Sequence, residues 1–194
     1  VATPSANHQA YKSTTGEIDG DFTFKFKISF DGGGDGGGIG VFDTDDSSWS
    51  GFPSSYARMI AVYIANGGDL YTGTHTGSGW NGSSSQLCSG NSGGTAQSIT
   101  GSDEKWVTLT KSATEWNVKV YDDSARSNLV CDDTRSFTDG GSSMVGFDTV
   151  NLFTKWSNQS GADYNYDDIE ITATTITQPY VAPIQYDMRF QSTL

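Results

Sequence analysis

Residues 21–30, DFTFKFKISF, constrain the fold of this chain more than any other stretch. Their apolar side chains alternate with polar ones, and the apolar set is Phe22, Phe24, Phe26, Ile28 and Phe30. A period of two places the two sets on opposite sides of an extended strand. The stretch therefore predicts a β-strand with one face in a core and the other face in water.

Further segments carry strand signals. Residues 58–65, RMIAVYIA, are apolar on both alternations and predict a strand that is buried on both faces. Residues 104–123 predict a hairpin whose turn lies near residues 111–114, and we expect Trp106 and Trp116 of this hairpin in the core. Residues 76–95 are rich in Gly and Ser and predict a long loop.

Composition sets the fold class and excludes some partners. The chain has 194 residues, of which 35% are hydrophobic, enough for the core of one domain. Short strands separated by turns predict an all-β fold, an antiparallel β-sandwich. The net charge of −12 argues against nucleic acid and anionic membranes as partners. No apolar stretch is long enough to insert into a membrane.

Three segments resemble the concanavalin A-like lectin/glucanase superfamily, the jelly rolls that include laminin-G-like modules. They are GDFTFKFKISF as the opening strand, KWVTLT with EWNVKVYDD as the central hairpin, and YNYDDIEI as the closing strand. The resemblance covers roughly residues 16–173, which we expect to form the jelly-roll domain. Residues 1–15 then form an N-terminal arm or edge strand, and residues 174–194 form an extended C-terminal arm.

The C-terminal arm carries its own strand pattern after two prolines. Its large apolar side chains suit the addition of a strand to a sheet edge, on this chain or on a neighbouring subunit. Both alternatives stay open at this stage. The residues expected to dock are Tyr180, Ile184, Tyr186, Met188 and Phe190.

The two cysteines, Cys88 and Cys131, bear on where the protein acts. In an extracellular chain we expect them to form a disulfide, which would contribute about 4 kcal/mol by closing the loop between them. Two separate thiols are the alternative. With the sequons at Asn81 and Asn158, the pair favours an extracellular, cell-surface or virion-surface location.

Catalysis is not expected. Laminarinase-type glucanases of this fold carry the pattern Glu-x-Asp-x-x-Glu on a strand, with two carboxylates working as a pair. Glu17 and Asp19 match the first two positions, but Phe22 stands where the second glutamate is required. The polysaccharide-lyase alternative is weak because the two histidines lack the required surroundings. A degenerate glycoside hydrolase or polysaccharide lyase is thus the third reading of function.

Acidic residues in two segments suggest structural calcium, because hard cations take several oxygen ligands. The segment FDTDDSSW has the spacing of half an EF-hand loop, without the glycine and glutamate that complete one. The closing strand is similar to that of carbohydrate-binding modules in which an aspartate binds calcium. The candidate ligands are Asp43, Asp45, Asp167 and Asp168.

Aromatic residues in polar segments suggest glycan binding, because their rings stack on sugar faces. The candidates are Trp49, Tyr56, Trp80 and Trp156.

Two functions remain. The first is a non-enzymatic structural or adhesive module of a larger extracellular or viral assembly, held to neighbouring subunits by its arm. The second is a stand-alone carbohydrate-binding lectin module. The arm is a positive feature and favours the first.

Overall fold

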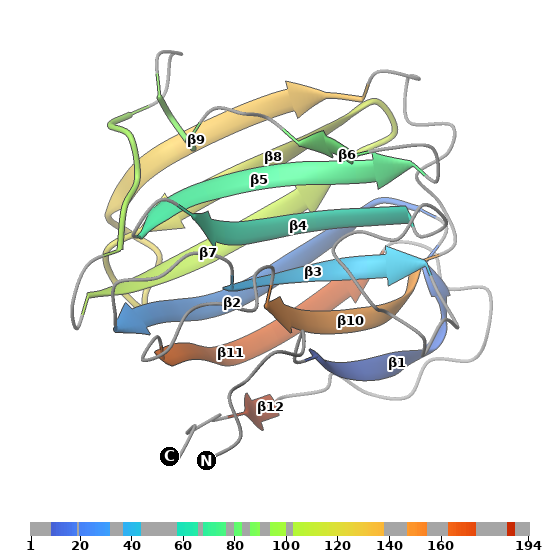
Figure 1. Ribbon diagram of the computed structural model, residues 1–194. Coiled ribbons are helices and arrows are strands. Elements are labelled where there is room, and N and C mark those ends of the chain that lie inside the picture. The colour runs from blue at the N-terminus through green and yellow to red at the C-terminus, as the bar shows by residue number, and fades with distance from the viewer. Residues whose placement is uncertain are drawn as a thin grey trace.

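The computed structural model shows an all-β protein built from two stacked six-stranded sheets (Figure 1). Every strand pairing in both sheets is antiparallel. The structure describes residues 9–18, 20–31, 37–43, 58–65, 68–76, 80–82, 86–89, 94–99, 103–137, 147–154, 163–173 and 186–188. The expected antiparallel β-sandwich is confirmed. Within those ranges no helix is long and apolar enough to cross a membrane.

Each sheet brings together strands that lie far apart in the sequence. Sheet I contains, in spatial order, β1 (Gln9–Ile18), β10 (Phe147–Thr154), β3 (Gly37–Asp43), β4 (Arg58–Ala65), β5 (Asp69–Thr76) and β6 (Trp80–Gly82). Sheet II contains β12 (Tyr186–Met188), β11 (Asp163–Ala173), β2 (Phe22–Asp31), β7 (Glu104–Lys111), β8 (Glu115–Tyr121) and β9 (Leu129–Ser136).

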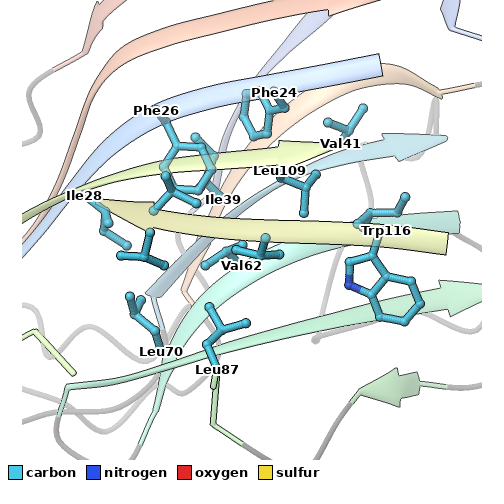
Figure 2. Close-up of a cluster of buried hydrophobic side chains, with 14 of the residues drawn as sticks. Phe24, Phe26, Ile28, Ile39, Val41, Val62, Leu70, Leu87, Leu109 and Trp116 are labelled. Atoms are coloured by element: carbon cyan, nitrogen blue, oxygen red, sulfur yellow. The ribbon is translucent and has the colours of Figure 1, made fainter. Parts of the chain in front are cut away.

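The alternating segment forms β2, and its five apolar side chains face sheet I, each at most 2% exposed. They interdigitate there with side chains of β3, β4 and β5 (Figure 2). The polar residues between them are half-buried on the opposite face. This strand therefore forms the centre of the core, as its period of two predicts.

Strand β4 is buried on both faces, as expected. Ile60 and Val62 belong to the core between the sheets, whereas Met59 and Tyr63 belong to a second apolar cluster on the other side of sheet I. Tyr63 stacks on Tyr71 of β5, with ring centroids 5.4 Å apart. Sheet I is thus covered on both faces along its centre.

Strands β7 and β8 form the predicted hairpin, but the two tryptophans differ in position. Trp116 is 4% exposed and lies in the core, where its ring is 4.9 Å from that of Phe137. Trp106 is only half-buried, because it alternates with the buried Val107 and so faces outward. The expectation of a core position is wrong for Trp106.

The segment expected as a long loop contains ordered structure. Trp80–Gly82 forms β6, which pairs with β5. Leu87 is fully buried in the core, and its backbone N–H donates to the carbonyl of Leu70. Ile99 is buried as well, and its N–H donates to the carbonyl of Gly68. Residues 86–89 and 94–99 therefore close one side of the sandwich beside β5.

Part of the C-terminal arm forms β12, which pairs with β11 at the edge of sheet II of the same chain. In register, Tyr186 lies opposite Ile169 and Met188 lies opposite Tyr166. Tyr180, Ile184 and Phe190 lie outside the described residues. The observed contact is within the chain, and docking of the arm on a neighbouring subunit stays a prediction.

Candidate functional site

The outer face of sheet II, the side of β2, β7 and β8 that faces away from the core, is polar and accessible to solvent. Its side chains alternate with the buried ones and are half-buried along all three strands. The register of the sheet brings them into rows that run across the strands. Since sheet I is buried on both faces along its centre, this face is the broad polar surface of the described sandwich.

One row is aromatic at its middle. Trp106 of β7 pairs in register with Tyr121 of β8, and on the other side it pairs with Lys27 of β2. Cross-strand neighbours on one face have Cβ atoms about 5 Å apart, so the two aromatic residues are neighbours on this face. Within the described residues the buried indole Nε1 of Trp106 has no hydrogen-bond partner. We call Trp106 and Tyr121 the aromatic pair.

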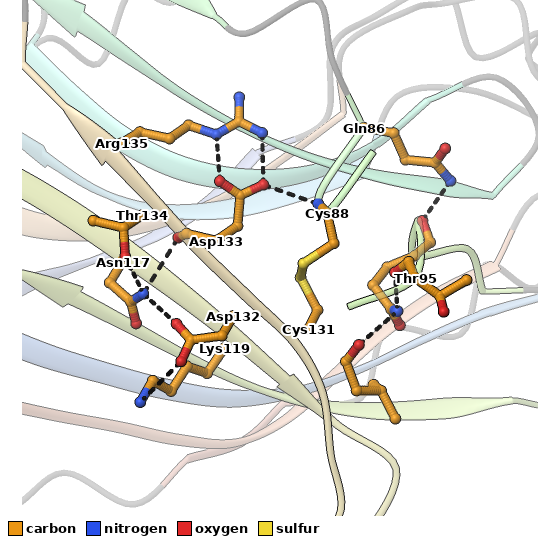
Figure 3. Close-up of a disulfide and its surroundings, with 12 residues drawn as sticks. Gln86, Cys88, Thr95, Asn117, Lys119, Cys131, Asp132, Asp133, Thr134 and Arg135 are labelled. Carbon is orange, nitrogen blue, oxygen red and sulfur yellow. Dashed lines mark hydrogen bonds and ion pairs between the residues drawn. A yellow bond between two sulfur atoms is a disulfide. The ribbon is translucent and has the colours of Figure 1, made fainter. Parts of the chain in front are cut away.

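A second row consists of hydroxyl and amide side chains. Thr23, Thr110 and Asn117 are consecutive cross-strand neighbours, and Thr134 of β9 continues the row. The amide of Asn117 donates to Asp132 Oδ1 at 2.6 Å and to Thr134 Oγ1 at 2.7 Å (Figure 3). Each of these side chains can donate or accept hydrogen bonds without carrying a charge.

Lys25 and Lys119 lie between these two rows, on either side of Thr108, and Lys27 lies in the row of the aromatic pair. The ion pairs, with their N–O distances, are Lys25–Glu170 at 3.4 Å, Lys27–Glu104 at 3.2 Å, Lys27–Asp167 at 3.3 Å and Lys119–Asp132 at 3.4 Å. Partial burial acts to lower the pKa of Lys27, but the hydrogen bonds and charges of Glu104 and Asp167 outweigh it and raise that pKa above its ordinary value.

An open recess of about 440 Å³ adjoins Trp106 at one end of β7. Its lining includes Trp106 and the carboxylates of Asp103, Glu104 and Asp122. Asp122 forms an ion pair with Lys105, with 2.5 Å between Nζ and Oδ1. The recess thus places hydrogen-bond acceptors beside an aromatic ring.

The disulfide between Cys88 and Cys131 ties residues 86–89 to β9 (Figure 3). Asp133 supports this connection, since its carboxylate accepts a hydrogen bond of 2.9 Å from the backbone N–H of Cys88. Arg135 donates two further bonds to the same carboxylate. Burial acts to raise the pKa of Asp133, but Arg135 and the Cys88 N–H outweigh it and hold that pKa below its ordinary value.

A second network of hydrogen bonds connects Gln86, in the same segment, to β5 of sheet I. Gln86 donates from Nε2 to Asp69 Oδ1 and to Ser98 Oγ, both at 2.9 Å. The hydroxyl of Ser98 donates to the same Asp69 oxygen at 2.6 Å. These bonds and the disulfide hold residues 86–89 and 94–99 between β5 and β9.

The structure does not test the predicted glycan-binding residues. Trp49, Tyr56 and Trp156 lie outside the described residues, and only the backbone of Trp80, in β6, is described. The aromatic pair, by contrast, was not singled out as a site from the sequence. The signal for it is the alternation in KWVTLTK and EWNVKVY, which places Trp106 and Tyr121 opposite the buried valines.

The predicted calcium ligands are not brought together by the described residues. Asp45 lies outside them, and Asp43 ends β3 opposite Arg58 in register. Asp167 pairs with Lys27 and accepts the backbone N–H of Asp168 at a β-bulge, where Asp168 has a φ of 52°. Across the described ranges no three His, Cys, Asp or Glu side chains are placed to hold a metal ion. Calcium binding stays a prediction.

The last position of the glucanase pattern lies in the core of the sandwich. Phe22, which stands where the second catalytic glutamate is required, is 2% exposed. Its ring packs edge-on against Phe147 of β10, with centroids 5.7 Å apart. A carboxylate at this position would therefore be buried among apolar side chains.

Comparison with known proteins supports the fold. No family model and no curated protein matches the chain. The exoplasmic/lumenal domain of VIP36 is similar in structure: its Ca²⁺/Man3GlcNAc-bound form covers 95% of this chain and 85% of its own, with a TM-score of 0.57 at 9% identity.

Two further solved structures also resemble the fold of this chain. The Ca²⁺/Man-bound form of VIP36 covers 96% of this chain and 84% of its own, with a TM-score of 0.56 at 8% identity. A double mutant of congerin II covers 85% of this chain and 100% of its own, with a TM-score of 0.51 at 9% identity. Identities this low show the fold alone. The chain is a lectin-like β-sandwich.

Proposed function

We propose that this chain is a non-catalytic glycan-binding module whose binding site is the outer face of sheet II. The observation that carries the proposal is the aromatic pair, Trp106 and Tyr121, on a face that otherwise consists of hydroxyl, amide and ion-paired side chains. Sugar rings present apolar C–H faces and a rim of hydroxyls, which such a surface matches with aromatic rings and polar groups.

The lectin-like fold supports the proposal at the level of architecture, because VIP36 has this fold in mannose-bound forms. Phe22, buried where the glucanase pattern requires a glutamate, supports the non-catalytic part. The disulfide supports an extracellular, lumenal or surface location, since disulfides persist in oxidising compartments. A structural or adhesive role in a larger assembly, which the arm suggests, stays a prediction.

A glycan array tests the proposal directly. Wild type is expected to bind at least one glycan class, and Trp106→Ala and Tyr121→Ala are each expected to weaken that binding about tenfold or more, because each removes a stacking surface. Thr114→Ala, at the exposed turn of the same hairpin, is the matched control and retains wild-type binding. Urea unfolding of every variant separates lost binding from lost folding.

The same array distinguishes the polar face from the predicted loop aromatics. A variant with Trp49, Trp80 and Trp156 all replaced by alanine is expected to bind like wild type. If this variant loses binding while Trp106→Ala keeps it, the site lies with Trp49, Trp80 and Trp156. An array that gives no signal for wild type contradicts glycan binding itself.

Calcium is a second part of the proposal, supported by the Ca²⁺-bound forms of VIP36 and by the acidic segment around Asp43 and Asp45. We expect chelation with EDTA to lower the melting temperature of the chain and added calcium to restore it. A matched Asp43→Asn, Asp45→Asn variant should then be insensitive to both treatments. An unchanged melting temperature in wild type contradicts a structural calcium ion.

A further inference from the structure

The charges on the outer face of sheet II are balanced at short range. Of the lysines that the structure describes on this face, Lys25 and Lys119 each pair with one carboxylate and Lys27 pairs with two. Three ammonium groups therefore face four carboxylates, Glu104, Asp132, Asp167 and Glu170. Among the described residues, the face carries no excess positive charge that would attract an anionic ligand.

Neighbouring carboxylates hold the ammonium groups of the lysines in ion pairs. Lys27, beside Trp106, is held between β7 and β11 by Glu104 and Asp167, and its side chain is 19% exposed. Asp132, the partner of Lys119, is itself held by the amide of Asn117 at 2.6 Å. A sulfate or carboxylate of a ligand would have to displace these groups while approaching a chain of net charge −12.

The remaining groups of the face suit uncharged hydroxyls. The row of Thr23, Thr110 and Asn117 lies on one side of Lys25 and Lys119, and the row of the aromatic pair and Lys27 lies on the other. Hydroxyl and amide groups both donate and accept hydrogen bonds, which is the chemistry of a sugar hydroxyl. Aromatic rings bind the C–H faces of a sugar whether or not it is charged.

We propose that the outer face of sheet II selects neutral glycans and discriminates against sulfated and uronic-acid-containing ones. This inference rests on the proposed function, because it names the class of ligand for the same site. It goes beyond that function by assigning the selectivity to the ion pairs of Lys25, Lys27 and Lys119. The aromatic pair supplies contact area, and the paired charges exclude anionic ligands.

The test uses an array that carries neutral mannose, glucose and galactose polymers beside sulfated and uronic-acid-containing polymers. Wild type is expected to bind a neutral polymer with a Kd that changes less than about twofold between about 0.05 and 0.5 M salt. Binding to heparin, dextran sulfate and alginate is expected to be at least about tenfold weaker. Binding that prefers these acidic polymers, and weakens steeply with salt, overturns the inference while glycan binding itself stands.

A charge variant tests the role of the ion pairs. Replacing Glu170 with Gln and Asp132 with Asn removes the partners of Lys25 and Lys119 and leaves the aromatic pair intact. This double variant is expected to gain salt-sensitive binding to dextran sulfate of about tenfold. The control Glu115→Gln, at the start of β8, removes one exposed charge of the same face without removing a partner of Lys25 or Lys119 and should gain none.

The outcomes separate this inference from the proposed function. A double variant that behaves like wild type toward dextran sulfate shows that the ion pairs do not control selectivity, and it overturns the inference alone. Absence of binding to every polymer, neutral and acidic, by a folded wild-type chain overturns the proposed function and this inference together.

Discussion

The hydroxyl of Thr72 in sheet I accepts a hydrogen bond of 3.1 Å from the indole Nε1 of Trp116 in sheet II. The same hydroxyl donates to the carbonyl of Ala61 at 2.9 Å. Both side chains are buried, Thr72 at 0% and Trp116 at 4% exposure. A polar contact thus connects the two sheets inside the core.

Replacing Thr72 with Val keeps the shape of the side chain and removes the hydroxyl. The indole N–H of Trp116 would then be buried without a partner, and we expect the free energy of unfolding to fall by about 1–3 kcal/mol. Urea unfolding measures the change. Thr72→Ser, which keeps the hydroxyl, is the control for the lost bond. A Thr72→Val chain as stable as wild type would show that this hydrogen bond contributes nothing net.

The disulfide is expected to stabilise the chain mainly through the unfolded state. Its cysteines are 43 residues apart in sequence, and closing a loop of this length contributes about 2–4 kcal/mol. A variant with both cysteines replaced by serine should unfold at correspondingly lower urea concentration. Wild type treated with a reductant should match it. If wild type unfolds at the same urea concentration with and without reductant, the disulfide does not contribute as expected.

Much of the sandwich could be predicted from local sequence. The period of two in residues 21–30 and 104–121 depends only on which side of an extended chain each residue faces, so β2 and the β7–β8 hairpin were predicted correctly. Trp106 was expected in the core because it lies in a strand rather than in a loop. Its place next to Val107 in the alternation decides its face, and this is why the aromatic pair was missed.

Other features depend on contacts that are distant in sequence. Leu87 and Ile99 are single apolar residues in a polar segment, and no period marks them as core residues. They are buried because backbone bonds to Leu70 and Gly68 dock this segment beside β5. The ion pairs of Lys25 and Lys27 likewise depend on the pairing of β11 with β2, which local sequence does not specify.

Stability at acid pH is expected to depend on Asp133. The pKa of this carboxyl is lower in the folded chain than in the unfolded chain, where it is about 3.9. Its stabilising effect is therefore complete above about pH 4 and is lost as the pH falls through the folded-state pKa. Asp133→Asn should be less stable than wild type at neutral pH, and the difference should shrink as the pH approaches 2 or so.

Urea unfolding across that pH range measures the difference for Asp133→Asn. Asp132→Asn serves as the control, because its carboxylate is 35% exposed and binds neither Arg135 nor the Cys88 N–H. A gap between wild type and Asp133→Asn that stays constant from neutral to acid pH contradicts the assignment of this effect to Asp133.

Stability at alkaline pH is expected to depend on Lys111, which is 2% exposed at the end of β7. Its Nζ donates to the carbonyl of Gly20 at 3.4 Å. Burial lowers the pKa of Lys111, against the attraction of the Asp21 charge. Between the folded-state pKa and the unfolded value of about 10.4, the unfolded chain binds more protons, so stability attributable to this lysine rises with pH.

Replacing Lys111 with Met removes the buried charge and keeps most of the side-chain volume. At neutral pH we expect Lys111→Met to be at least as stable as wild type, because no ammonium group has to be buried. As the pH rises toward about 10, wild type should gain stability relative to the variant, measured by urea unfolding. Lys119→Met, which removes a lysine that is 39% exposed, controls for the general loss of one charge. If wild type instead loses stability relative to Lys111→Met as the pH rises, the lowered pKa of Lys111 is contradicted. Such a loss is what a lysine would cause if folding raised its pKa.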